Sequence, residues 1–84
     1  MQEKEIGKIS HYFGHIGVGI IELTDALKVG DSVRIKGHTT DLTEMVESMQ
    51  LDHNSVGEAA KGQAVGIKVA AKVHPNDKVY KIIP

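Results

Sequence analysis

The sequence predicts an all-β fold, a small closed barrel of antiparallel strands. Isoleucine and valine dominate the hydrophobic content, aromatic residues make up 4%, and there are nine glycines among 84 residues, a composition that favours strands over a helical bundle. Short apolar stretches alternate with period two at regular spacing. Closure into a barrel removes the edge strands that so apolar a chain would otherwise expose.

The first two strands are expected at residues 6–13 and 16–23, with Gly14 turning the chain between them. Residues 6–13 alternate between two partly apolar faces. In residues 16–23 the apolar phase changes between Ile20 and Ile21. A period-two pattern that slips by one residue is typical of a β-bulge, which we therefore predict in the second strand.

The third predicted strand is Ser32–Lys36, with Val33 and Ile35 pointing inward and Arg34 and Lys36 outward. The last two strands are expected at residues 63–71 and 78–83. The connections are expected at residues 24–31, at residues 54–62 with a helical turn at 58–61, and at residues 74–77.

Residues 41–50 allow two interpretations. Asp41 followed by Glu44 is the spacing of a helical capping box. Apolar side chains then follow the helical spacing i, i+3, i+4 and i+7, at Leu42, Met45, Val46 and Met49. A helix here would leave five strands, the number in an OB-fold. The alternative is a bent strand whose apolar phase slips between Val46 and Met49, which gives six strands.

Four segments carry recognisable motifs. They are LKVGDSVRI at 27–35, VESMQLDH at 46–53, EAAKGQAVGIKV at 58–69 and NDKVY at 76–80. In this order and spacing they resemble the second, β-barrel domain of translational GTPases such as elongation factor Tu, and small stand-alone elongation-factor-like proteins. The resemblance covers about residues 14–83. It implies a six-stranded Greek-key barrel of this translation-protein type, with residues 46–53 as a strand, and we predict one domain over residues 1–84.

The motifs of most enzyme and metal sites are missing. The chain has no G-x-x-x-x-G-K-[ST] phosphate loop, so the GTPase activity of those factors is not expected, nor is nucleotide binding. It has no cysteine, and on strands His11 and His15 would lie about 13 Å apart, too far to share a zinc ion. No serine lies in a nucleophile-elbow pattern. We therefore expect no catalytic residues, no metal and no cofactor: a protein that is not an enzyme.

The resemblance also indicates a candidate binding position. In the tRNA-carrying relatives, the strand that matches residues 46–53 helps to form a pocket for the terminal adenosine of aminoacyl-tRNA. Gln50 stands where those factors have an acidic residue, and its carbonyl oxygen could still accept a hydrogen bond. His53 could stack or donate beside it. The alternative is that Met49 and Leu51 fill the core while Gln50 and His53 are merely exposed neighbours.

The charged residues leave two kinds of partner open. Arg34, Lys36, Lys68 and Lys72 would form a modest basic face if the fold brings them together, although the net charge is −1 and not basic. The expected function is a non-enzymatic translation-factor-like module that binds RNA, either tRNA or the ribosome. The alternative is a protein-docking module for an enzyme or GTPase partner, which the near-neutral charge suits better.

The first residues give an expectation about location. The segment MQEKEIGK is charged and is followed by no apolar run long enough for a signal peptide or a membrane span. We therefore expect a cytoplasmic protein without a membrane partner.

Overall fold

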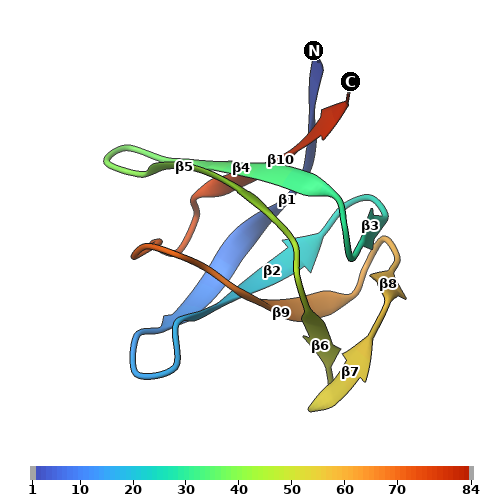
Figure 1. Ribbon diagram of the computed structural model, residues 1–84. Helices are drawn as coiled ribbons and strands as arrows, with labels where there is room; N and C mark the ends of the chain where they lie inside the picture. Colours follow the sequence, from blue (N-terminus) through green and yellow to red (C-terminus); the bar gives the residue numbers. More distant parts are fainter. Residues whose placement is uncertain (1, 84) are drawn as a thin grey trace.

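The computed structural model describes residues 2–83, in which all regular secondary structure is β-strand and all strand pairs are antiparallel. Eight strands form one curved sheet in the order β5-β4-β10-β1-β2-β9-β6-β7, and β3 and β8 form a second, two-stranded sheet (Figure 1). The strands are β1 (Gln2–Phe13), β2 (Val18–Leu23), β3 (Leu27–Lys28), β4 (Ser32–Lys36), β5 (Asp41–Met45), β6 (Met49–Leu51), β7 (Asn54–Val56), β8 (Glu58–Ala59), β9 (Ala64–Lys68) and β10 (Lys78–Ile83). The all-β, antiparallel prediction is confirmed.

The long strand β1 is shared by two parts of the sheet. Its first half pairs with β10 and its second half with β2. The register with β10 shifts between Glu5 and Gly7, and the register with β2 shifts between Ile9 and His11. Each shift leaves one extra residue in β1, which is the signature of a β-bulge and bends the strand.

The prediction of a bulge in the second strand is therefore wrong. β2 pairs with β9 without a register shift, and both shifts lie in β1. In β2 the buried phase is Gly19, Ile21 and Leu23. Gly19 leaves room there for Val73, whose Cγ2 would lie 3.3 Å from an added Cβ. A glycine in an inward position interrupted the apolar alternation and imitated a phase slip.

The helix considered for residues 41–50 does not form. Residues 41–45 are strand β5, which pairs with β4 through a tight turn in which the Gly37 N–H donates to the Thr40 carbonyl over 2.8 Å. Pairing with a neighbouring strand outweighs the local helical pattern. The predicted strand over residues 46–53 is also only partly present, because β6 covers Met49–Leu51 alone.

The end of that predicted strand is a turn. Asp52 and His53 have φ angles of 51° and 66°, and they connect β6 to β7 as a two-residue hairpin loop. Two successive left-handed residues are the requirement of the type I′ turn, which matches the twist of the flanking strands. The resemblance to the translational GTPases placed His53 in the strand, and neither residue of this turn is a glycine that would have marked it.

Two predicted connections contain further short strands. Leu27–Lys28 (β3) pairs with Glu58–Ala59 (β8), so the helical turn expected at 58–61 is a strand followed by a turn.

The curved sheet ends at β5 on one side and at β7 on the other, and no ladder joins these ends within residues 2–83. The structure thus has more strands than the six predicted, several of them only two or three residues long, and a closed six-stranded barrel is not found in that form.

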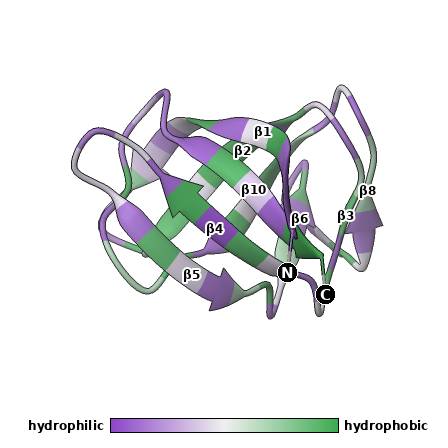
Figure 2. Ribbon diagram, turned by 90° about the horizontal axis from the view of Figure 1, so that it is seen from above, coloured by the Kyte–Doolittle hydropathy of each residue, from purple (hydrophilic) through white to green (hydrophobic). Residues whose placement is uncertain are grey.

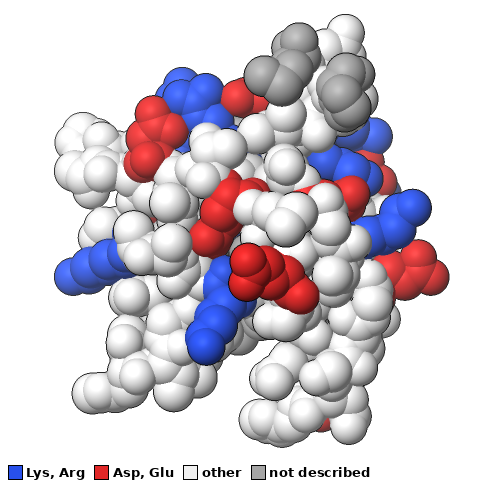
Figure 3. All heavy atoms as spheres, viewed as in Figure 1, with Lys and Arg blue, Asp and Glu red and all other residues white. Residues whose placement is uncertain are grey.

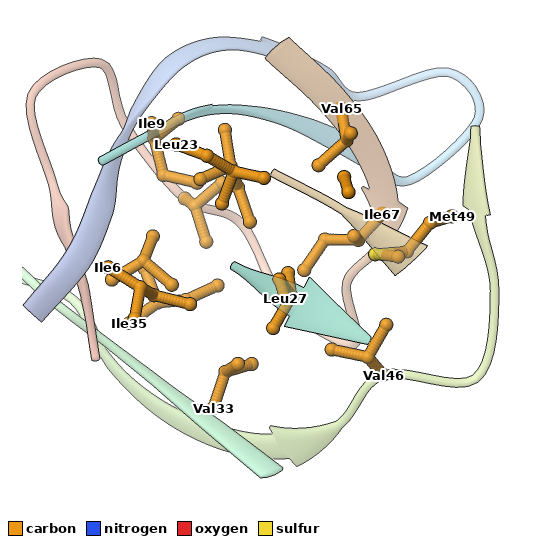
Figure 4. Close-up of a cluster of buried hydrophobic side chains, with 14 residues drawn as sticks. Ile6, Ile9, Leu23, Leu27, Val33, Ile35, Val46, Met49, Val65 and Ile67 are labelled. Carbon is orange, nitrogen blue, oxygen red and sulfur yellow. The ribbon is translucent and has the colours of Figure 1, made fainter. Parts of the chain in front are cut away.

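The curvature of the sheet encloses one core. Side chains from strands all around the molecule point to a common interior (Figure 4), and along the visible strands hydrophobic and hydrophilic residues alternate (Figure 2). The buried hydrophobic residues are Ile6, Ile9, Ile21, Leu23, Leu27, Val33, Ile35, Val46, Met49, Ala59, Val65, Ile67, Val73 and Val79. Each large aliphatic side chain buried in this way contributes about 1.5–3 kcal/mol.

The ends of the described chain lie side by side, with Gln2 opposite Ile83, and they project together from the body of the molecule (Figure 1). No helix in residues 2–83 is long and apolar enough to cross a membrane.

The bend of β1 requires a glycine at position 7. A Cβ added to Gly7 would collide with the backbone carbonyl oxygen of Glu22 and lie 3.0 Å from Cγ2 of Ile21. We expect Gly7→Ala to lower the free energy of unfolding by about 1–3 kcal/mol, as overpacking does. In urea unfolding, the matched control Gly57→Ala should change it by no more than about 0.5 kcal/mol, because nothing lies within 4 Å of its added Cβ. Equal stability of the two variants would contradict this account.

Candidate functional site

The free edge of β5 is the longer of the two strand edges that end the curved sheet, five residues against three in β7. Two backbone hydrogen bonds show which residues of β5 bond to β4. The Gly37 N–H donates to the Thr40 carbonyl, and the Val46 N–H donates to the Asp31 carbonyl over 2.8 Å. With the observed register, the bonded residues of β5 are Leu42 and Glu44. Antiparallel ladders alternate, so the N–H and C=O groups of the other three residues, Asp41, Thr43 and Met45, point away from β4 toward the open edge.

A surface hollow of about 260 Å³ lies beside this edge. It is lined by the end of β5, by Glu47 in the segment after β5, by the end of β9 and by the two residues after β9. The lining residues are Glu44, Met45, Glu47, Lys68, Val69 and Ala70. We call it the β5 hollow. Figure 3 shows acidic side chains near the middle of this face, over the segment that links β5 to β6, beside a basic side chain. Positive and negative groups are otherwise interspersed there, and this face carries no extended basic field.

Glu44 is the central polar group of the β5 hollow. Its side chain is half-buried, and Oε2 accepts a hydrogen bond from the Ala70 N–H over 3.1 Å. Its Oε1 is inaccessible to solvent and has no hydrogen-bond partner among the described residues. Burial raises the pKa of Glu44 and nearby Glu47 adds to the rise, while the Ala70 bond opposes it. Glu44 thus spans the gap between β5 and the chain after β9 with an incompletely satisfied carboxylate.

The predicted basic residues on β4 do not form a free basic face. Arg34 binds Asp41 through Nε and Nη2, both at 2.9 Å, and Glu3 through Nη1 at 3.0 Å. These bonds raise the pKa of Arg34, and the Arg34 guanidinium lowers the pKa of Asp41. Lys36 is exposed and lies opposite Asp41 in the ladder. The charge of Arg34 is therefore balanced within the protein.

The remaining candidate residues lie on other strands. Gln50 is exposed on β6 and pairs with Ser55 and Gly66, and His53 is exposed in the β6–β7 turn. Lys68 ends β9, and Lys72 is exposed in the segment that follows. Strands β10, β1 and β2 separate β4 from β9 in the sheet, so the four basic residues are not brought together along it. Of the six residues predicted, Lys68 alone lines the β5 hollow.

Glu44, Met45 and Glu47 line the β5 hollow but were not predicted as site residues. In the sequence, Glu44 stands out only as part of the helical capping box that was one of two alternatives for residues 41–50. The signal that could have identified it is the strand alternation Leu42–Glu44–Val46, which places a carboxylate in the inward phase.

A hydroxyl, an imidazole and a carboxylate, from Thr40, His74 and Asp77, lie close together where residues 74–77 pack on the β4–β5 turn. Thr40 Oγ1 lies 3.0 Å from Nδ1 of His74, and Asp77 Oδ2 lies 3.8 Å from the same nitrogen. In a catalytic triad the nucleophile and the orienting carboxylate contact different ring nitrogens of the histidine, whereas here both lie near Nδ1. Thr40 and Asp77 are also about 95% buried. Asp77 Oδ2 also accepts from the His74 N–H over 2.9 Å. We conclude that this cluster fastens one turn onto another.

The described residues also bring together no group of three or more histidine, cysteine, aspartate or glutamate side chains that could hold a metal ion.

With the geometry established, the chain can be compared with known proteins. No protein-family model matches it. It is 42% identical over 77 residues to a protein from Methanocaldococcus jannaschii named uncharacterized protease, a match that covers 90% of this chain and 19% of that protein. It is 37% identical over 82 residues to a collagenase from Porphyromonas gingivalis, covering 95% of this chain and 23% of that protein. The chain spans about a fifth of the length of these curated relatives.

The solved structures agree with these relatives. The C-terminal domain of a putative U32 peptidase from Geobacillus thermoleovorans superimposes with a TM-score of 0.89, at 20% identity, over 95% of this chain and 93% of that domain. The chain has the fold of a U32 peptidase C-terminal domain.

These matches correct three expectations from the sequence. The resemblance to the second domain of translational GTPases did not identify the right relatives, since the similar proteins are peptidases. A translation-factor-like module that binds RNA is therefore wrong as the function, and its protein-docking alternative gains no support. The expectation that the chain is not an enzyme is also overturned, because the relatives are named protease and collagenase.

The motifs misled because their residues have structural roles. In the LKVGD segment, Leu27 is buried, Gly30 has a φ of 97°, and Asp31 Oδ2 accepts the Lys28 N–H over 2.9 Å. In the EAAKGQ segment, Gly62 has a φ of 89° and Gln63 Oε1 accepts the Ala60 N–H over 2.8 Å. These residues form the turns that precede strands. Proteins with similar turns can therefore share them without sharing a function.

The raised pKa of Glu44 gives a pH-dependent prediction. A carboxyl whose pKa is higher in the folded state stabilises the protein when protonated, and this contribution is lost as pH rises through the folded pKa. We expect Glu44→Gln to raise the melting temperature at pH 7, where it removes the buried charge. The advantage should vanish below about pH 4, where the wild-type carboxyl is also neutral. Thermal unfolding from pH 3.5 to 7.5 measures this, and Glu22→Gln, an exposed glutamate on β2, is the control. A pH-independent difference would contradict the prediction.

Proposed function

We propose that this chain is the polypeptide-binding domain of a U32-type peptidase. The observation that carries the proposal is the match of 90–95% of this chain to about a fifth of relatives named protease and collagenase. The likeness to the C-terminal domain of a putative U32 peptidase supports the same fold. The substrates of a protease and of a collagenase are polypeptides, and the contribution proposed for this domain is to hold such a chain for the peptidase.

The distribution of polar groups favours a polypeptide over RNA. The net charge is −1, and Arg34 is engaged by two carboxylates. Nucleic-acid binders present a basic surface that neutralises phosphates. A strand edge with free N–H and C=O groups instead suits an extended peptide backbone, which presents the same groups at the same spacing.

We further propose that residues 1–84 form one domain whose longer strands make a six-stranded Greek-key barrel. The strands with five or more residues are β1, β2, β4, β5, β9 and β10. In the observed order, β5 and β9 are the outer members of this set. The Glu44–Ala70 hydrogen bond between β5 and the chain after β9 supports closure at this position. This closure is made by a side chain and not by a backbone ladder, so the outward backbone groups of Asp41, Thr43 and Met45 stay unpaired beside the β5 hollow.

A binding experiment tests the proposed function. The purified protein is titrated by fluorescence anisotropy into labelled ribonuclease A that has been reduced and blocked with iodoacetamide, and into labelled gelatin. We expect saturable binding to both unfolded chains. Native ribonuclease A is the matched control and should not bind, because its backbone groups are already paired.

The same titration includes bulk tRNA at low salt, where electrostatic binding is strongest. We expect no saturable binding of tRNA. Saturable tRNA binding together with no binding of either unfolded polypeptide would overturn the proposed function.

A further inference from the structure

We propose that the edge of β5 takes up an extended polypeptide segment as an additional β-strand, with a basic side chain of that segment placed over the β5 hollow. This inference rests on the proposed function, and it names the surface that binds and the class of sequence that is bound.

The edge offers a regular set of hydrogen-bonding groups. The backbone N–H and C=O groups of Asp41, Thr43 and Met45 point away from β4, as the register and the bonds that flank the hairpin require. No ladder occupies this side of β5 in the part of the chain that the structure describes. Added strands use such groups for affinity, while the side chains on alternating positions give specificity.

The edge has only one of the usual protections against pairing. Native edges are blunted by proline, by lysine, by a bulge or by an inward-pointing charge, and here only the last is present, at Glu44. Residues 41–45 read DLTEM, without proline or lysine, and β5 pairs with β4 in unbroken register. The charge of Asp41, at the start of the edge, is engaged by Arg34. The other end of the sheet, β7, is three residues long and offers a shorter ladder.

The β5 hollow selects for a basic side chain. Two carboxylates, Glu44 and Glu47, line it against one ammonium group, Lys68. Glu44 is half-buried and Glu47 is exposed, so the hollow presents a negative charge that complements a basic side chain of a bound chain. Met45 is 54% exposed at the same place, and its flexible thioether can pack along the aliphatic part of a lysine or arginine.

The probe is a capped ten-residue peptide of alternating valine and threonine with one central lysine. Two matched peptides carry norleucine or glutamate in place of the lysine. Each is titrated into the full 15N-labelled chain, followed by backbone amide shifts and by anisotropy. We expect shifts concentrated at residues 41–47 and 68–70. The lysine peptide should bind about threefold to fivefold more tightly than the norleucine peptide, the size of a partly exposed ion pair, and the glutamate peptide more weakly than either.

Two substitutions separate the contribution of backbone hydrogen bonding to peptide affinity from the contribution of the Glu44 charge. Thr43→Pro removes one outward N–H without removing a native ladder bond, and we expect affinity to fall about threefold to tenfold. Thr43→Val keeps the N–H and should bind normally. Glu44→Gln should reduce the preference for lysine, because Glu47 alone then remains, while binding of the norleucine peptide persists. The control Glu22→Gln should change neither the affinity for the peptides nor the preference for lysine. If Thr43→Pro does not fold, the shift map of the wild-type protein still locates the bound peptide.

The outcomes distinguish this inference from the proposed function. Binding with shifts confined to the β6–β7 turn or to the β1–β2 turn would overturn the β5 inference and leave polypeptide binding intact. Equal affinity for the lysine and norleucine peptides would overturn the selection by charge. Failure of unfolded ribonuclease A, gelatin and all three peptides to bind would overturn both.

Discussion

The bend of β1 is the constraint on which the positions of the other strands depend. Its two bulges allow one strand to pair with β10 in its first half and with β2 in its second. The sheet therefore curls around a single core instead of remaining flat. Gly7 lies between the bulges, where the backbone of Glu22 approaches too closely for any side chain. In a chain of 84 residues this curvature is needed for a sufficient core, because a small domain has little apolar surface to bury.

The same curvature determines where the strand pairing of the sheet ends. Following the strands from β1 in one direction leads through β10 and β4 to β5, and in the other through β2 to β9. Both paths reach the same side of the molecule, where Glu44 binds the Ala70 N–H. A carboxylate there makes one contact in place of a backbone ladder, and half of its hydrogen-bonding capacity stays unused. The contact that completes the fold therefore lies beside the unpaired backbone groups of β5, on which the proposed binding of an extended chain rests.

The relation to peptidases and the earlier resemblance to translation factors have a common explanation. Turn residues such as Gly30, Asp31 and Gly62 are required by left-handed φ angles and by side-chain bonds to the backbone. Any chain that makes the same turns before the same strands needs these residue types. The proposed function depends instead on surface residues such as Glu44, which lies outside the motifs. Sequence identity of 37–42% over nearly the whole chain was needed to identify the right relatives.

The sequence by itself determined the strand character of the chain and part of its core. Period-two alternation placed Val33 and Ile35 inward, and both are buried, because inward positions of a strand are apolar where the sheet covers a core. Only the tertiary structure decided between helix and strand at residues 41–45, where a local helical pattern competes with pairing to β4. It also decided the place of the bulges and the free edge of β5. These depend on which strands become neighbours, and residues far apart in the sequence settle that together.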